Sequence, residues 1–141
     1  MQAIEYLKQL RSYETIIKNK MFERERWKAL AYGTTAHSDG ERVQASSNQQ
    51  KMADAVVKYI EIEQEIGRYI DRLCDKRKGI MDTIALLDVD EYDVLHQIYV
   101  QYKSMKEVAM DLDRSTSWVK HIRKNAINNL QKILDEREKH G

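Results

Sequence analysis

A short stretch near the C-terminal end combines basic side chains with an absence of acidic ones. Between residues 114 and 134 there is no aspartate or glutamate. Cationic side chains on one surface neutralise phosphates, whereas carboxylates there would repel a polyanion. The chain as a whole shows no such imbalance, because 24 Lys and Arg residues stand against 23 Asp and Glu residues. Any polyanion is therefore expected to bind at this local patch, whose basic residues are Arg114, Lys120, Arg123, Lys124 and Lys132.

Other residue types that carry chemistry are scattered along the chain. The histidines and the single cysteine do not have the spacing of a zinc site. The glycines do not form a phosphate-binding loop, and no Ser-His-Asp or Cys-His set is suggested by neighbouring residues. We therefore expect no enzymatic activity, no metal and no cofactor. The scattered residues are His37, His96, His121, His140 and Cys74.

The basic patch must be positioned by helices, and capping residues mark where these helices begin. Asp88 is expected to cap a short helix that runs to about Tyr102. Ser104 with Glu107 predicts a capping box at the start of a second short helix, over roughly 105–111. Ser115 is expected to cap the last helix. These signals divide the C-terminal part of the chain into three helices.

The second and third of these helices are expected to cross closely. Ala109 is small enough for such a crossing, and Asp113 is expected to adopt a left-handed backbone in the turn. Val108, Leu112, Val119 and Ile122 would then fill the shared core. This is the layout of a helix-turn-helix, whose second helix fits the major groove of DNA. Its outer face would present Thr116, Ser117, Lys120, His121 and Lys124.

Residues 1–87 have the pattern of two long helices with a loop between them. Apolar residues recur every three or four positions from 1 to about 32 and again from 50 to about 86, in narrow stripes typical of coiled coils. The segment 33–48 breaks this periodicity and is expected to be a loop, with Ser47 capping the second helix.

Long helices with narrow stripes have no core of their own and must pack on each other or on a second chain. The simplest arrangement is an antiparallel hairpin, formed within one chain or between two. One pair of narrow stripes buries little area for its length, which favours a homodimer through this arm. We therefore expect an all-α protein with a hairpin or coiled-coil arm at 1–87 and a three-helix helix-turn-helix module at 88–141.

Composition agrees with long helices, because 141 residues contain no proline and five glycines. Cys74, the single cysteine, cannot form an internal disulfide. No apolar stretch approaches the roughly 20 residues of a membrane span, and charged residues interrupt the N-terminal region where a signal peptide would lie. These features predict a cytoplasmic protein.

A set of apolar, capping and basic positions runs through the C-terminal module: Glu91, Val94, Leu95, Ile98, Tyr99, Ser104, Glu107, Val108, Ala109, Leu112, Ser115, Trp118, Val119, Lys120, Ala126 and Leu130. This set resembles region four of bacterial sigma factors, which contacts the −35 promoter element through a helix-turn-helix. The whole chain resembles small phage and prophage proteins of Gram-positive bacteria, grouped with the ArpU-like and RinA-like late-gene regulators. The stretches 47–56 and 70–73 are also typical of that group.

Two positions depart from the sigma-region-four pattern. Asp113 stands where glycine is usual, and Trp118 is bulkier than the residue common at its position. Trp118 is expected either to pack against the arm or to stack on the DNA backbone.

The resemblance assigns the promoter contacts to one segment and divides them into two kinds. Base-edge contacts carry sequence information, whereas phosphate contacts fix the register of the protein on the duplex. Ser115 is expected to cap its helix and to contact a phosphate. The base-edge group is Thr116, Ser117, Lys120 and His121, and the backbone-anchoring group is Arg114, Arg123 and Lys124.

These expectations describe a sequence-specific double-stranded DNA-binding regulator of transcription, of phage or prophage genes, that reads the major groove with helix 115–130. Two alternatives stay open. In the first, the chain is an adaptor that docks on the host RNA polymerase, and its contact with DNA is secondary. In the second, it is a DNA recogniser similar to a phage small terminase. The expected partners are double-stranded DNA, the RNA polymerase in the adaptor case, and a second copy of the chain.

Overall fold

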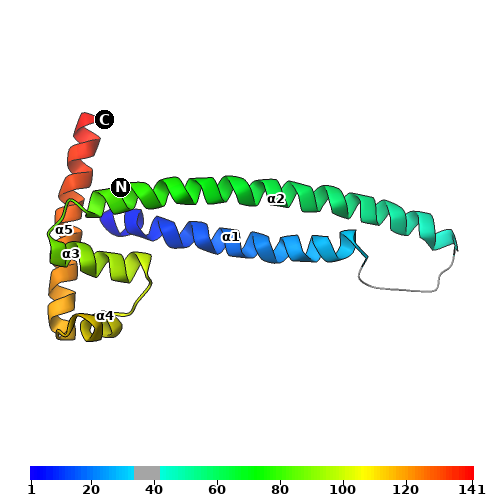
Figure 1. Cartoon of the computed structure of the whole chain (residues 1–141). Helices are drawn as coiled ribbons and strands as arrows, with labels where there is room; N and C mark the ends of the chain where they lie inside the picture. Colours follow the sequence, from blue (N-terminus) through cyan, green and yellow to red (C-terminus); the bar gives the residue numbers. More distant parts are fainter. Residues whose placement is uncertain (34–41) are drawn as a thin grey trace. The chain divides into compact units, whose positions relative to one another are not determined.

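The computed structural model of the chain describes residues 1–33 and 42–141, with the backbone alone described for residues 42–46. Every regular element within these residues is a helix, so the expected all-α class is confirmed. In chain order (Figure 1) the elements are α1 (Ala3–Ala31), α2 (Arg42–Ile84), α3 (Val89–Leu95), the π-helix η1 (His96–Val100), α4 (Met105–Leu112) and α5 (Thr116–His140). No helix in the described part of the chain is long and apolar enough to cross a membrane.

The two long helices differ from the sequence prediction at one point. Helix α1 ends at Ala31, as expected, but α2 begins at Arg42 and not near residue 50. The predicted cap Ser47 therefore lies inside α2, and the loop expected over 33–48 is wrong for its last seven residues. A serine pattern marks a helix start in many sequences, but no glycine or proline lies between Arg42 and Ser47, so the helix is continuous through this stretch. Residues 34–41 of that predicted loop lie outside the described residues.

The described chain forms two compact units. One comprises residues 1–12 and 73–141 and is called the core unit here, and the other comprises residues 13–72 and is called the two-helix unit. Helices α1 and α2 contribute to both. This division differs from the predicted domain boundary after residue 87, because both chain segments that flank the two-helix unit belong to the core unit.

In the two-helix unit, α1 and α2 run antiparallel. Tyr13 of α1 lies against Tyr69 of α2, with ring centroids 6.3 Å apart, whereas Tyr32 lies against Tyr59, at 6.2 Å. Between these pairs the Lys20 ammonium lies 2.6 Å from a Glu65 carboxylate oxygen and lowers the pKa of that carboxyl. An ion pair this exposed contributes at most about 1 kcal/mol. Burial of apolar residues, among them Ile17, Ala55 and Ile66, therefore contributes more to the packing of the two helices.

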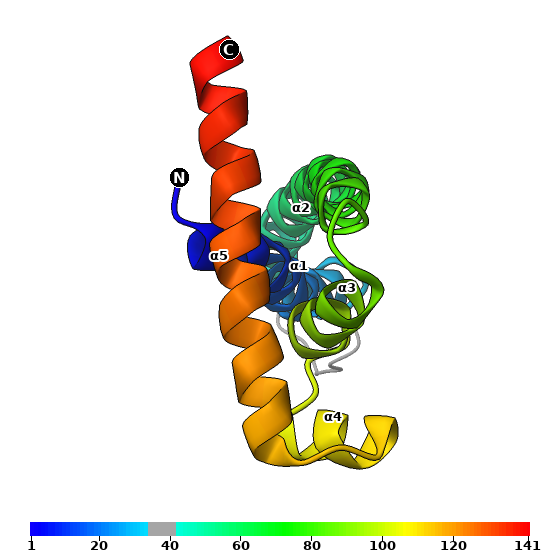
Figure 2. The same cartoon turned by 90° about the vertical axis from the view of Figure 1, so that its left-hand side faces the viewer.

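The main apolar cluster of the core unit is assembled from four separate parts of the chain. The first turns of α1, the end of α2, the α3–η1 segment and the second half of α5 all supply buried side chains. Figure 2 shows α5 passing the beginning of α1 and the α3 segment. Residues 1–12 and 73–84 therefore share one core with α5. The buried members are Ala3, Leu7, Leu10, Ile80, Ile84, Leu95, Tyr99, Val100, Ala126, Leu130 and Leu134.

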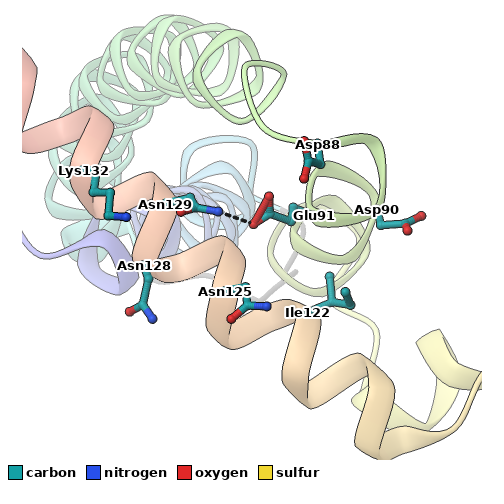
Figure 3. Close-up of a pocket in the computed structure, with 8 residues that line it drawn as sticks. All are labelled: Asp88, Asp90, Glu91, Ile122, Asn125, Asn128, Asn129 and Lys132. Atoms are coloured by element: carbon teal, nitrogen blue, oxygen red, sulfur yellow. Dashed lines mark hydrogen bonds between the residues drawn. The ribbon is translucent and has the colours of Figure 1, made fainter.

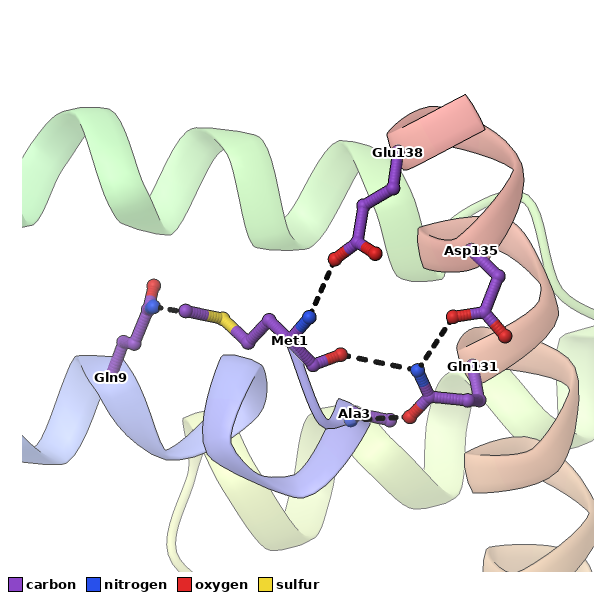
Figure 4. Close-up of polar contacts among 6 residues, drawn as sticks. All are labelled: Met1, Ala3, Gln9, Gln131, Asp135 and Glu138. Carbon is purple, nitrogen blue, oxygen red and sulfur yellow. Dashed lines mark hydrogen bonds and ion pairs between the residues drawn. The ribbon is translucent and has the colours of Figure 1, made fainter. Parts of the chain in front are cut away.

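Polar contacts fix the first turn of α1 on α5. The backbone N–H of Ala3 donates to Gln131 Oε1 at 2.7 Å, and Gln131 Nε2 donates to the carbonyl of Met1 at 3.1 Å (Figure 4). The same amide donates to Asp135 on α5. One glutamine thus satisfies an N–H at a helix start that has no intrahelical partner.

A second polar cluster ties the end of α2 to α1 and α5. Thr83 is 1% exposed, and its hydroxyl donates to the carbonyl of Gly79 at 2.7 Å. Arg137 of α5 donates to the same hydroxyl oxygen at 2.7 Å, and the hydroxyl of Tyr6 lies 3.0 Å from it. A buried oxygen with three partners is fully satisfied, so Thr83 belongs to the core although its polarity interrupts the apolar stripe.

We expect Thr83→Val to destabilise the folded chain by about 1–3 kcal/mol, because the substitution keeps the side-chain shape but removes the hydrogen bonds that join Arg137 and Tyr6 to the end of α2. Urea unfolding followed by circular dichroism measures the change. Thr15→Val, at an exposed site of α1, serves as the matched control. Equal unfolding midpoints for the two variants would contradict the role of the Thr83 cluster.

Candidate nucleic-acid interface

Helices α4 and α5 meet in a small apolar cluster of their own. Val94 of α3, Val108 and Ala109 of α4, and Val119 of α5 are its buried members. The half-buried side chains that pack against it include Leu112, Trp118 and Ile122. The predicted shared core of Val108, Leu112, Val119 and Ile122 is therefore confirmed. Trp118 packs against this cluster, within the C-terminal helices.

The turn between α4 and α5 has the predicted backbone. Asp113 adopts φ 54° and ψ 49°, in the left-handed region. The N–H of Arg114, the next residue, donates to the carbonyl of Ala109 at 2.9 Å. This bond closes the end of α4 in the manner of helix C-caps with a left-handed residue. The turn fixes the backbone of Arg114 relative to the helix crossing.

Of the three helix starts predicted in the C-terminal part of the chain, two are capped as predicted. Ser104 Oγ accepts the N–H of Glu107 at 3.2 Å, and a Glu107 oxygen accepts the N–H of Ser104 at 3.1 Å, which confirms the capping box. This backbone hydrogen bond lowers the pKa of Glu107. Ser115 Oγ accepts the N–H of Trp118 at 3.1 Å, which confirms the cap of α5.

The capping role predicted for the Asp88 side chain is wrong. Asp88 does stand at the N-cap position of α3, but its side chain makes no capping hydrogen bond. The nearby Glu91 is buried and accepts a hydrogen bond from Asn129 Nδ2 at 2.8 Å. That long-range contact joins α3 to α5 and has no signature in the local sequence.

The predicted DNA-contacting residues gather at the beginning of α5 and in the turn before it. All except Arg123 are exposed: Arg114, Ser115, Thr116, Ser117, Lys120, His121 and Lys124. The buried stripe of α5 faces the helical core, so these side chains lie on the solvent side of the helix. The structure thus brings seven predicted side chains to one end of one helix.

Arg123 is oriented differently. It is half-buried, and its Nε and Nη2 atoms donate to the hydroxyl of Tyr99 at 3.1 and 2.7 Å. Tyr99 itself belongs to the main apolar cluster of the core unit. Arg123 therefore ties α5 to η1.

The charges on this surface are free to meet a polyanion. Among the described residues, Arg114, Lys120 and Lys124 form no ion pair with a carboxylate. The Arg114 guanidinium lies over the Trp118 ring, with its carbon 4.9 Å from the ring centroid. His121 lies 3.2 Å from Asn125 through Nε2 and Nδ2. Phosphate binding therefore requires no internal ion pair to break.

The sequence analysis did not identify two exposed residues of α5 that lie beside the predicted contact residues. Asn125 and Asn128 lie four positions after His121 and Lys124, so they continue the same side of the helix. Asparagine amides donate and accept hydrogen bonds with base edges and phosphates. Their four-residue spacing from His121 and Lys124 could have identified them in the sequence. The search for a cationic segment did not find them, because amide side chains carry no charge.

A hollow of about 380 Å³ borders this surface, between the start of α3 and the middle of α5 (Figure 3). Asp88, the residue before α3, lines it together with Asp90 and Glu91 of α3. These carboxylates disfavour phosphate on the α3 side of the hollow. The residues that line it from α5 are Ile122, Asn125, Asn128, Asn129 and Lys132.

The described residues hold no group of three or more His, Cys, Asp or Glu side chains placed to bind a metal ion. Comparison of the chain with protein-family models, with curated proteins and with solved structures finds no match.

The capping box makes stability depend on pH. The folded-state pKa of Glu107 is lowered, so its ionised form stabilises the fold above the unfolded-state pKa, near 4.5, and this contribution is lost as the pH falls through the lower folded-state pKa. We expect Glu107→Gln to lower the urea midpoint at pH 7, with the difference from the unsubstituted chain shrinking as the pH falls below 4.5 and through the folded-state pKa. Glu23→Gln, at an exposed site of α1, is the control. A difference that does not change with pH would contradict this role.

Proposed function

We propose that the chain is a sequence-specific double-stranded DNA-binding regulator of transcription that reads the major groove with the first half of α5. The observation that carries this proposal is the set of exposed cations and hydroxyls at the start of α5, where the packed α4–turn–α5 arrangement holds them. Arg114, Lys120 and Lys124 of this set form no ion pair with a carboxylate among the described residues. The resemblance of the same residues to sigma region four adds the expected target, which is a promoter of phage or prophage genes in the bacterial cytoplasm.

The division of contacts follows from position on α5. Thr116, Ser117 and Lys120 occupy the first turns, which enter deepest when a recognition helix lies in the groove. The N-terminal end of a helix also attracts phosphate through its unpaired N–H groups and dipole. Base-edge contacts are therefore assigned to Thr116, Ser117, Lys120 and His121, and phosphate contacts to Arg114, Ser115, Arg123 and Lys124.

The decisive experiment is selection of binding sites from random duplex DNA with the full chain at near-physiological salt. We expect an enriched sequence, and an affinity for it that falls as salt concentration rises, because phosphate neutralisation releases counterions. A chain that binds purified RNA polymerase but shows no salt-sensitive DNA affinity would instead be a polymerase adaptor. Ring-shaped oligomers on DNA would indicate a terminase-like recogniser.

Lys120→Ala is expected to weaken binding to the selected site by about 1–3 kcal/mol and to relax the preference at one base pair. The measurement is a titration of the selected duplex and of duplexes with single base changes. Lys28→Ala removes an exposed lysine of the two-helix unit and should leave both quantities unchanged. Equal losses for all duplexes would reassign Lys120 to the phosphate backbone.

We propose further that two copies associate through the two-helix unit. Its support is the exposed apolar surface of that unit, where Phe22, Leu30, Val57 and Ile60 are 66%, 56%, 54% and 49% exposed. Apolar side chains at this density on paired helices favour association. A dimer would present two α5 helices to half-sites about one DNA turn, or a multiple of it, apart.

Ile60→Glu is expected to convert the dimer to a monomer, because a carboxylate cannot be buried unpaired in an apolar interface. Light scattering of the full chain measures the mass. Gln49→Glu introduces the same charge at another exposed position of α2 and should leave the dimer intact. A monomeric mass for the unsubstituted chain would refute the dimer.

A further inference from the structure

We propose that Trp118 is a positioning residue that holds the Arg114 guanidinium ready to bind a DNA phosphate. This inference rests on the proposed function and assigns a role to the residue that departs most in size from the sigma-region-four pattern. Trp118 would act on DNA through Arg114, by limiting where the charged group can go.

The backbone of Arg114 is already fixed before DNA arrives. Asp113 takes the left-handed conformation that ends α4, and the N–H of Arg114 donates to the carbonyl of Ala109 at 2.9 Å. Ala109 is buried at the crossing of α4 and α5. The backbone of Arg114 is therefore tied to a buried residue of the α4–α5 cluster, although its side chain is exposed.

The indole ring is fixed independently. Trp118 lies in the first turn of α5, and its backbone N–H donates to the capping oxygen of Ser115 at 3.1 Å. Its side chain is half-buried against the cluster that contains Val108 and Val119. Because the backbone and the side chain of Trp118 are both held, its ring offers a fixed surface to Arg114.

The guanidinium lies on this surface. Its carbon is 4.9 Å from the centroid of the Trp118 ring, within the range of a cation–π contact. Among the described residues no carboxylate forms an ion pair with Arg114. Because this contact is made to the π face of the ring and not to an acceptor atom, the guanidinium keeps N–H donors that can bind a phosphate.

The consequence for binding is a smaller loss of side-chain freedom. An unrestrained arginine must be immobilised when it binds phosphate, and this cost lowers affinity. An arginine already restricted by an aromatic face loses less. Trp118 is therefore expected to strengthen DNA binding without contributing a phosphate contact of its own.

Two measurements on the full chain test the two parts of this proposal. In the DNA-free protein, NMR should show the side-chain protons of Arg114 shifted upfield by the ring current of Trp118, and Trp118→Leu should abolish the shift. Titrations of the selected duplex at several salt concentrations should then compare Arg114→Ala, Trp118→Leu and the double variant.

Arg114→Ala should weaken binding roughly tenfold and reduce the salt slope by about 1, because one phosphate contact is lost. Trp118→Leu should weaken binding roughly threefold with the slope retained, since Arg114 still reaches the phosphate but from a less ordered state. The double variant should bind as Arg114→Ala does, because Trp118 acts through Arg114. Trp118→Phe keeps an aromatic face and should restore most of the affinity.

Matched controls separate positioning from folding. Trp27→Leu removes the second tryptophan, in the two-helix unit, and should change neither affinity nor slope. Should Trp118→Leu fail to fold, Trp118→Phe and the chemical shifts of the unsubstituted chain still test the stack.

Several results would overturn the proposal. Additive losses in the double variant would limit Trp118 to a packing role, and unshifted Arg114 protons would exclude the stack. An unchanged salt slope in Arg114→Ala would exclude the phosphate contact. If the chain bound no DNA, both this proposal and the proposed function would fail; DNA binding that is insensitive to Arg114 would overturn this proposal alone.

Discussion

The structure depends on burial of one apolar stripe along α5. Val119, near the start of this helix, belongs to the cluster with α4, whereas Ala126, Leu130 and Leu134 belong to the main cluster with α1, α2 and η1. One continuous helix therefore joins both apolar clusters of the core unit. Because a helix that buries one stripe must expose the opposite side, the same packing sets Lys120 and Lys124 in solvent. The candidate interface is therefore the side of α5 opposite its buried stripe.

The local details of that interface were predictable because short-range contacts determine them. The capping box of Ser104 and Glu107 involves positions three residues apart, and so does the cap that Ser115 provides for α5. Asp113 adopts its left-handed backbone at the point where α4 must end and α5 begin. Side chains that bond to nearby N–H groups act before any tertiary contact forms. A reader of the sequence can therefore locate such turns without knowing the fold.

Contacts between distant segments were not predictable in the same way. Asp88 and Glu91 resemble a helix start, but Glu91 is engaged by Asn129, and Arg123 is engaged by Tyr99. Thr83 interrupts an apolar stripe in the sequence and is nevertheless buried, because Arg137 and Tyr6 reach its hydroxyl. Glu91, Arg123 and Thr83 each have a partner more than twenty positions away. No pattern within one helix records which distant residue will satisfy it.

The sequence by itself determined the all-helical class, the closely packed α4–turn–α5 arrangement and the location of the acid-free cationic segment, because periodicity, capping and charge are local properties of the chain. The tertiary structure alone decided that residues 1–12 and 73–84 share a core with α5, that Arg123 is held by Tyr99 and that Arg114 lies on Trp118. These outcomes follow from the packing of whole helices, in which apolar stripes find partners by shape and area. Such packing depends on the shapes of whole helix surfaces, which form only when the chain folds.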